Sequence, residues 1–381
     1  MTAADHSGRI FLDSAGSSLP PEPVLDEVIA HLRREAEIGG YRAAAERAED
    51  LEQGYDVIAE LVGCERDEVA FTDSATRSWL TAFDAIPLGK GDRILVTEVE
   101  YAGNAVPLLR RAEETGAVIE VIPSDHSGQV DVEALGELLD ERVKLVSVVH
   151  VPTNSGLVNP AKEIADKAHE VGAIVMLDAC QSVGQVDVRG TGVDILSFTG
   201  RKWLRGPRGT GALMVRNEVR HKLHPRLVDM HGGEWTGPNE IRLRDDARVF
   251  ELWEYSYADR LGLIAAAKFA LDKGIGEIER EVAERAKRLR EGLSAIPQVE
   301  VRDIGKRKSG ITTFTVEGVE PQTVKQRLYE QNVTVSVSPG NSTLLDTTKR
   351  GLDEVVRASP HYFVTDDQID QAVEAVSRSV R

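Results

Sequence analysis

The chain has 381 residues, of which 41% are hydrophobic and 29% charged, long enough for about two domains and a large core. Its net charge of −17 disfavours nucleic acid and anionic membranes as partners, because both need a basic surface, and no apolar run approaches the roughly 20 residues of a membrane helix. Two cysteines and no signal pattern over Met1–Ile10 predict a globular cytoplasmic enzyme without disulfides or a metal cluster.

The first part of the chain predicts an α/β domain. A helix is expected over 22–36, packed beside a smaller domain or across a partner subunit. From about residue 68 to 213, short apolar runs alternate with amphipathic stretches such as 106–114 and 161–170. The expected strands are Val69–Thr72, Arg93–Val96, Val118–Ile122, Leu145–His150, Ile174–Leu177 and Ile195–Phe198. This alternation indicates a mostly parallel sheet covered on both faces, with ligands bound at the carboxyl ends of its strands.

The pattern changes after residue 260. One long helical stretch over 261–293 precedes short strands and helices that predict a smaller α+β domain. The expected elements there are strands 299–301, 311–316 and 333–337 and helices 321–331 and 366–379. We therefore divide the chain into an N-terminal segment (1–20) that packs with the small domain, a large domain (21–260) and the small domain (261–381).

Three strand ends carry residues that suggest one site. Asp178 follows the strand 174–177, Lys202 follows the strand 195–198, and Asp73–Thr76 opens a helix after the strand 69–72. Alone, each has an ordinary explanation, namely a helix cap, an ion pair or a surface lysine. Together, an acid, a lysine and a hydroxyl-rich helix start suit pyridoxal 5'-phosphate (PLP), which needs a Schiff-base lysine, a partner for its ring nitrogen and a phosphate site.

These segments resemble the class V aminotransferases, the fold-type I PLP enzymes that include cysteine desulfurases. The resemblance spans nearly the whole chain and rests on Leu12–Gly16, Asp73–Thr76, Asp178–Gln181, Thr199–Lys202 and Arg357–Tyr362. It implies a fold-type I PLP-dependent transferase, with a mostly parallel sheet of the seven-stranded type in the large domain. It also implies a homodimer that acts on an amino-acid substrate, with each site completed by the partner.

The resemblance assigns roles around the cofactor ring. Lys202 would carry PLP as a Schiff base and move the substrate's α-proton, which requires a lysine pKa depressed by burial. Asp178 would pair with the ring nitrogen, and Gln181 would bond the ring's phenolic oxygen. Tyr101 replaces the family's ring-stacking histidine; it can stack but cannot serve as an imidazole acid or base.

It also assigns roles around the phosphate and the substrate. Ala75 and Thr76 would bind the phosphate, with Thr199 and Arg201 completing that cup. Arg201 stands where the family has histidine, so a charge-assisted contact would replace a neutral one. Arg357 would clamp the substrate α-carboxylate in bidentate geometry, which lysine cannot copy.

Other positions stay open. The family asparagine that contacts the ring oxygen corresponds to Thr153 by gap-free counting but to Asn154 by side-chain chemistry, and we favour Asn154. Trp235 and Trp253 could line the pocket or pack at a dimer interface. Glu254 aligns near a threonine that touches the phosphate in cysteine desulfurases, a role that a carboxylate cannot fill.

The loop before Arg357 bears on the reaction. A persulfide-relay cysteine desulfurase needs a mobile cysteine there, but residues 335–343 contain no thiol, and Cys180 reads as a small buried side chain. We therefore expect β-elimination instead, which cleaves the C–S bond of a bulky S-substituted L-cysteine to give a thiol or sulfenate, pyruvate and ammonia. Residues 35–41 and the Ala/Glu-rich helix after them resemble members with that activity, such as the ergothioneine-pathway sulfoxide lyase.

Two alternatives remain. The same lysine, aspartate and arginine would serve an aminotransferase, an epimerase or a decarboxylative deaminase. A non-catalytic protein that kept the fold is disfavoured, because Lys202, Asp178 and Arg357 are all present.

Overall fold

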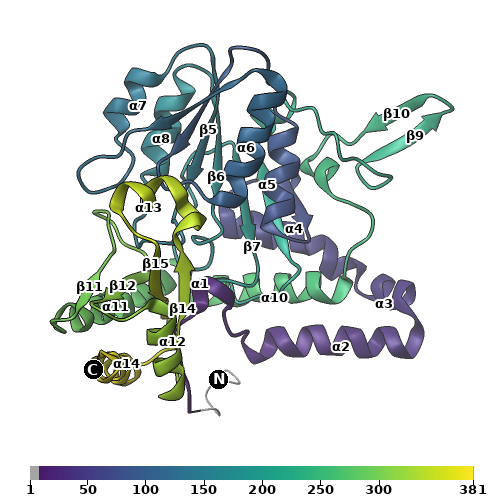
Figure 1. The fold of residues 1–381 in the computed structure, drawn as a ribbon. Helices are drawn as coiled ribbons and strands as arrows, with labels where there is room; N and C mark the ends of the chain where they lie inside the picture. The colour runs from purple at the N-terminus through teal and green to yellow at the C-terminus, as the bar shows by residue number, and fades with distance from the viewer. Residues whose placement is uncertain (1–7, 381) are drawn as a thin grey trace.

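The computed structural model describes residues 8–380, so the first seven residues of the N-terminal segment lie outside the described part. Its centre is a seven-stranded sheet in the order β2-β8-β7-β6-β5-β3-β4, parallel except for β8 (Figure 1). The strands are β2 (Val69–Thr72), β3 (Arg93–Thr97), β4 (Val118–Ile122), β5 (Val143–Val149), β6 (Ile174–Asp178), β7 (Ile195–Thr199) and β8 (Gly211–Val215). The predicted α/β class with a mostly parallel seven-stranded sheet is confirmed.

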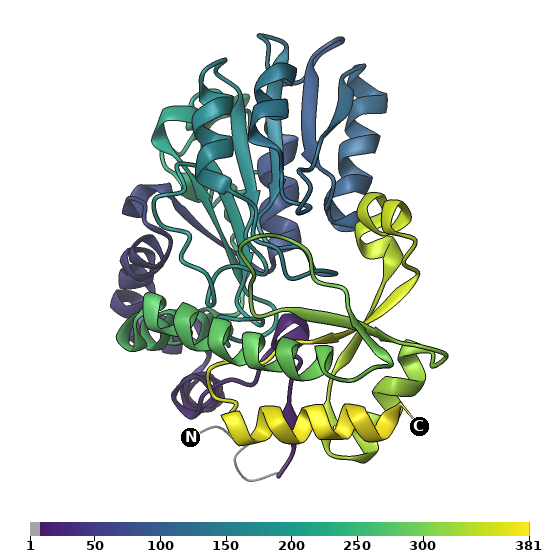
Figure 2. The same ribbon diagram turned by 90° about the vertical axis from the view of Figure 1, so that its left-hand side faces the viewer.

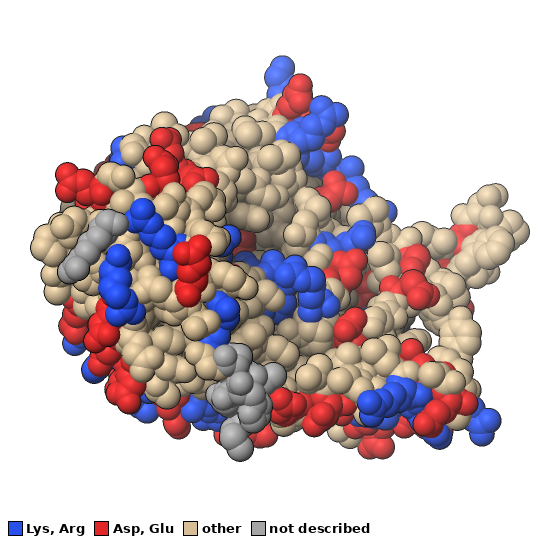
Figure 3. All heavy atoms as spheres, turned by 60° about the horizontal axis from the view of Figure 1, so that its bottom comes forward, with Lys and Arg blue, Asp and Glu red and all other residues tan. Residues whose placement is uncertain are grey.

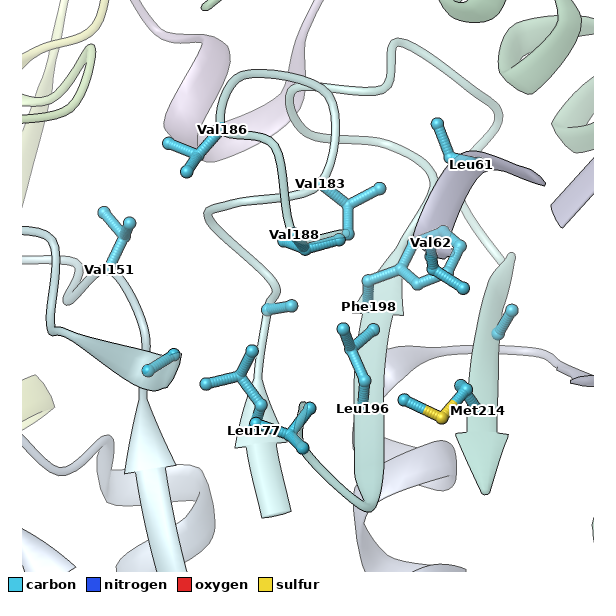
Figure 4. Packing of buried hydrophobic residues seen from close by; sticks show 14 of the residues in the cluster. Leu61, Val62, Val151, Leu177, Val183, Val186, Val188, Leu196, Phe198 and Met214 are labelled. Atoms are coloured by element: carbon cyan, nitrogen blue, oxygen red, sulfur yellow. The ribbon is translucent and has the colours of Figure 1, made fainter. Parts of the chain in front are cut away.

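Helices cover both faces of this sheet. They are α4 (Ala48–Val62), α5 (Ala75–Asp84), α6 (Ala102–Thr115), α7 (Val132–Leu138), α8 (Ala161–His169) and α10 (Tyr257–Lys273). Alternate strand residues feed two separate cores: Phe71 and Leu95 join a cluster with α4, α7, α8 and α10, whereas Ala70 and Ile94 join one with α5 and α6. In Figure 4, apolar side chains of β6, β7 and β8 in the first cluster lie beside those of α4.

The C-terminal part forms a second unit around a four-stranded sheet in the order β11-β12-β15-β14. Its elements are α11 (Ile275–Ser294), β11 (Val299–Val301), β12 (Thr312–Val316), α12 (Pro321–Glu330), β13 (Val333–Thr334), β14 (Ser336–Pro339), α13 (Leu344–Arg350), β15 (Glu354–Ala358) and α14 (Asp366–Ser379). Helices α11 and α14 lie side by side beneath this sheet (Figure 2). The N-terminal strand β1 (Ile10–Phe11) pairs in parallel with β13, so it belongs with this unit.

The predicted helix over 261–293 is two helices, because Gly274 adopts a positive φ of 90° between α10 and α11 and turns the chain. The buried face of α10 packs with the large-sheet core, whereas Leu289 and Leu293 of α11 pack in the core of the small sheet. The small unit's own core thus begins within α11, later than the predicted boundary at residue 261. The predicted strand 333–337 is also divided, since β13 pairs with β1 and β14 with β15.

The remaining elements lie along the chain between these units. They are α1 (Ser14–Ser17), α2 (Glu22–Ile38), α3 (Gly40–Glu46), α9 (Asn217–Arg220), β9 (Gly233–Gly237), β10 (Glu240–Leu243) and short 3-10 turns at Arg66–Glu68, Ala247–Phe250 and Gly340–Thr343. Helix α2 packs against α10, and the β9–β10 hairpin projects from the body (Figure 1). Within residues 8–380, no helix is long and apolar enough to cross a membrane.

Candidate active site

A cavity of about 330 Å³ lies where the two units meet. Its walls come from the carboxyl ends of β5, β6 and β7, the first turns of α5 and α6, the segment around Ala15 and the small unit's β14 and β15. This is the sheet edge at which parallel α/β folds collect ligands. The basic side chains in its lining are Arg201, Lys202 and Arg357. Figure 3 shows a hollow near the middle of the molecule's lower face, with basic side chains around it.

Lys202 and Asp178 both face this cavity. Burial, together with the neighbouring Arg201 charge, lowers the pKa of the Lys202 ammonium, so part of its amine is neutral at lower pH than in an ordinary lysine. Asp178 ends β6, and its carboxylate is held at both oxygens. Oδ1 accepts from the Cys180 backbone N–H at 2.9 Å and Oδ2 from Asn104 Nδ2 at 2.9 Å. The pocket therefore contains an amine that can be neutral and an oriented acid.

Tyr101 and Cys180 also line the cavity. Tyr101 is 43% exposed, so its ring is accessible from the cavity. Cys180 was read as a small, buried side chain, and the structure places it in the pocket lining beside Asp178. Burial, followed by the Asp178 charge, raises the pKa of its thiol well above the usual value. That thiol is a weak nucleophile at neutral pH, because the thiolate is the reactive form.

The anion end of the cavity is the start of α5. Ser74 caps this ten-residue helix by accepting the Arg77 N–H at 3.2 Å, and Ala75 and Thr76 line the pocket in its first turn. Backbone N–H groups at a helix start attract a phosphate. Thr199 lines the cavity nearby while its hydroxyl donates to Thr210 O at 3.1 Å.

Arg201 lines the same cavity and ties it to the N-terminal segment. Its Nη1 group donates to the Gly16 carbonyl, and its own carbonyl accepts from the Ser18 N–H at 2.8 Å. The predicted phosphate residues are therefore brought together on one side of the pocket.

Arg357 reaches the pocket from β15 and is held by three neighbours. Nη1 donates to Thr153 Oγ1 at 2.5 Å, and Nε donates to Ser336 Oγ at 3.2 Å. Nη2 lies 3.4 Å from Asp13 Oδ1, which also accepts from Ser336 Oγ at 2.8 Å. None of these three contacts was predicted from the sequence, although Thr153 was named as a candidate for the ring oxygen. Asp13 lies in the Leu12–Gly16 segment, which carries part of the family resemblance, but the resemblance gave Asp13 no role of its own.

Two amide residues differ from their expected positions. Asn154 does not face the cavity but braces the loop after β14, donating to Pro339 O at 3.0 Å and accepting from Ser338 Oγ. Thr153, the residue that gap-free counting gives, lines the cavity instead, whereas Asn154, the residue we favoured, does not. Gln181 lines the pocket, but its amide donates to Ala15 O at 3.1 Å and its oxygen accepts from Trp203 Nε1 at 2.8 Å.

The aromatic and acidic residues around 230–255 lie elsewhere. Trp235, on the β9–β10 hairpin, is 79% exposed, and Trp253 is 47% exposed; neither is in the cavity lining. Glu254 lines a smaller neighbouring cavity beside Thr72 and Asp73, behind the start of α5. The lining of the cavity in this chain therefore does not include Trp235 or Trp253.

These residues fit PLP. The cavity offers a buried lysine with a lowered pKa, a carboxylate fixed at the end of β6 and a helix start at the far side. Tyr101 and Cys180 add an aromatic and a small side chain to the same walls. The donor set therefore supplies each group that the cofactor's aldehyde, ring nitrogen and phosphate require.

Comparisons with known proteins agree with this fit. Residues 10–372 match the family described as "Aminotransferase class-V". The chain is 32% identical to the probable cysteine desulfurase 2 of Mycobacterium leprae, over 97% of this chain and 91% of the relative. The structure matches the apo cysteine desulfurase of Thermococcus onnurineus NA1 (25% identity, TM-score 0.89, 100% and 98% coverage). It also matches C-DES with glycine linked to its PLP cofactor (21% identity, TM-score 0.88, 98% and 97% coverage).

These matches correct the predicted reaction. Curated relatives and a structural neighbour are cysteine desulfurases, so the prediction of β-elimination of a bulky S-substituted cysteine, with desulfuration disfavoured, is wrong. The prediction gave too much weight to the missing thiol in one loop. The likeness to the ergothioneine-pathway sulfoxide lyase is not confirmed. The predicted cofactor, PLP, is confirmed, and the chain belongs to the class V aminotransferase family.

Proposed function

We propose that this protein is a PLP-dependent cysteine desulfurase, which moves the sulfur of L-cysteine to an acceptor thiol and releases alanine. The observation that carries the proposal is the single pocket in which Lys202, Asp178 and Arg357 converge. The names of the relatives support cysteine as the substrate.

Each of the polar residues that line the pocket has a separate role in the proposed reaction. PLP bound at Lys202 supplies an electron sink that weakens the bonds at the amino acid's Cα. Arg357 binds the α-carboxylate with the N–H groups that its protein partners leave unused. The Lys202 amine removes the proton from Cα, which requires the neutral form that burial favours. Asp178 pairs with the ring nitrogen, and the first turn of α5 with Arg201 holds the phosphate.

The acceptor thiol comes from outside the chain. The loop 336–343 presents hydroxyl groups, and Ser338 is bonded to Asn154. Of the two cysteines, Cys64 lies away from the cavity, where burial raises its pKa to about 12, and Cys180 has a strongly raised pKa in the pocket wall. In the transfer, the acceptor thiolate attacks the substrate sulfur and forms an S–S bond while the Cβ–S bond breaks. The electron pair passes to Cβ, which takes up a proton, so one alanine and one acceptor persulfide form per cysteine.

The test is product analysis with L-cysteine. Purified protein loaded with PLP is incubated with and without dithiothreitol as acceptor, and alanine, sulfide and pyruvate are quantified. We expect alanine and sulfide in equal amounts, dependent on the added thiol, and none from the Lys202→Ala variant. Pyruvate in place of alanine, or no alanine at any thiol concentration, would refute the proposal.

We propose that the protomers pair through the face that carries the β9–β10 hairpin. Met230, Trp235 and Ile241 are exposed there, an apolar group typical of an interface. Light scattering after size exclusion should give twice the chain mass, and Trp235→Ser should weaken pairing; a monomeric wild-type protein would contradict this.

The free thiols of Cys64 and Cys180 fit a reducing compartment, so we propose a cytoplasmic location, testable by cell fractionation.

A further inference from the structure

A second, buried carboxylate lies behind Asp178. Glu100, in the turn after β3, is 3% exposed, and its oxygens accept three hydrogen bonds, one each from its own turn, α6 and β5. Oε1 accepts from the Tyr101 N–H and from Asn104 Nδ2, each at 3.0 Å, and Oε2 accepts from Ser147 Oγ at 3.0 Å. Glu100 is outside the cavity lining, so it does not meet a ligand directly.

Asn104 connects this carboxylate to the active site. Its Nδ2 group has two hydrogens, and they go to Glu100 Oε1 at 3.0 Å and to Asp178 Oδ2 at 2.9 Å. Asn104 is 5% exposed, lies in the first turn of α6 and lines the cavity together with its chain neighbours Tyr101 and Gly103. With Asp178 Oδ1 held by the Cys180 N–H, the position of Asn104 sets the plane of the Asp178 carboxylate.

We propose that Glu100 is a positioning residue for the cofactor: through Asn104 it fixes the Asp178 carboxylate in the orientation that meets the ring nitrogen. The inference depends on the confirmed cofactor and not on which bond of the substrate is broken. Without Glu100, one hydrogen of Asn104 has no acceptor, and the amide can rotate away from Asp178.

The charges in this network also favour that role. The charged side chain that faces Glu100 is Asp178, across the Asn104 amide, and the other contacts are the Tyr101 N–H and the Ser147 hydroxyl. Burial first, and then the Asp178 charge, raise the pKa of Glu100 to about 7. Glu100 can therefore carry a proton near neutral pH, which reduces the electrostatic repulsion between Glu100 and Asp178.

The experiment compares PLP binding in four variants. Glu100→Gln keeps an oxygen for Asn104 and the Tyr101 N–H, whereas Glu100→Ala and Asn104→Ala remove the link, and Glu68→Ala is the control. Glu68 is an equally buried carboxylate, bonded to Arg216 Nη1 and the Asn217 N–H far from the cavity. The readouts are the PLP dissociation constant, the pH titration of the bound cofactor's absorbance, and apoprotein folding by circular dichroism.

We expect Glu100→Ala and Asn104→Ala to weaken PLP binding about 10- to 100-fold, the size of a hydrogen bond to a charged group, and to change the absorbance titration. Glu100→Gln should stay within about threefold of wild type in PLP affinity while its titration shifts, because the geometry persists and the ionisable proton is lost. Wild-type affinity and titration in both alanine variants would overturn the proposal. If an alanine variant does not fold, Glu100→Gln decides: an unshifted titration overturns it.

Discussion

Replacing Arg357 with lysine tests the geometry of substrate binding. A guanidinium has five N–H bonds, and Thr153, Ser336 and Asp13 take one each, from Nη1, Nε and Nη2 respectively. One N–H remains on each of the two Nη atoms, which form a fork for a carboxylate. Lysine can offer one of these contacts at most. The loss is one charge-assisted hydrogen bond of about 1.5–3 kcal/mol, so kcat/KM for L-cysteine should fall about 10- to 100-fold.

The assay compares L-cysteine with cysteamine, which has the same amine and thiol but no carboxylate. If Arg357 binds the α-carboxylate, Arg357→Lys should lower kcat/KM for L-cysteine but leave kcat/KM for cysteamine nearly unchanged, because cysteamine has no carboxylate. The ratio of the two values should therefore fall. A matched control is Arg290→Lys, since the Arg290 side chain is 12% exposed, close to the 10% of Arg357, and is bonded to Asp303 and to the Ser309 and Ile311 carbonyls, away from the cavity. An equal loss on both substrates in Arg357→Lys would mean a purely structural role and would refute the reasoning.

Three further predictions follow from other contacts. Lys202→Ala should abolish the borohydride-sensitive absorbance near ~420 nm and lower turnover at least about 10²- to 10⁴-fold; a surviving band would exclude it as the Schiff-base lysine. Asn154→Ala should lower the free energy of unfolding in urea by about 1–3 kcal/mol, because two buried hydrogen bonds to the loop are lost, and an unchanged midpoint would contradict this. The pKa of Glu100 is raised from 4.5 to about 7, so the stability from its proton is full below pH 4.5 and lost as the pH rises through 7. Wild type should therefore lose about 3 kcal/mol more than Glu100→Gln between pH 4.5 and 8 in urea unfolding, and parallel curves would refute the shift.

The sheet and its strand-end residues could be predicted because their signals are local. Apolar runs that end at Asp178 and before Lys202 place both side chains at one sheet edge, whatever the rest of the chain does. The break at Gly274 was missed because the amphipathic pattern continues across it, although a glycine between two helices was the available signal. The division of 333–337 into two strands depends on pairing with β1, more than 300 residues away, which periodicity does not report.

Within the site, contacts between distant segments were the part that could not be predicted. Thr153 and Asn154 are neighbours in the chain, and only the turn decides which one meets Arg357 and which one braces Pro339. Asn104 lies one helical turn after Glu100, a spacing that suggests their contact but not the second bond to Asp178. The reaction was predicted wrongly because the absence of a thiol from one loop does not exclude desulfuration.

The cavity walls include two segments that lie far apart in the sequence, around Ala15 and around Arg357, and this has a consequence for biosynthesis. Ala15 N donates to Ser359 Oγ at 3.0 Å, across 344 positions in sequence, and the Ser359 N–H donates to Leu12 O at 2.7 Å. On the ribosome, Asp178 and Lys202 are made long before Arg357 emerges. The nascent large sheet can form early, but its ligand cavity gains its last wall only once β15 has been made. PLP is therefore expected to bind after the segment around Ser359 has joined the segment around Ala15.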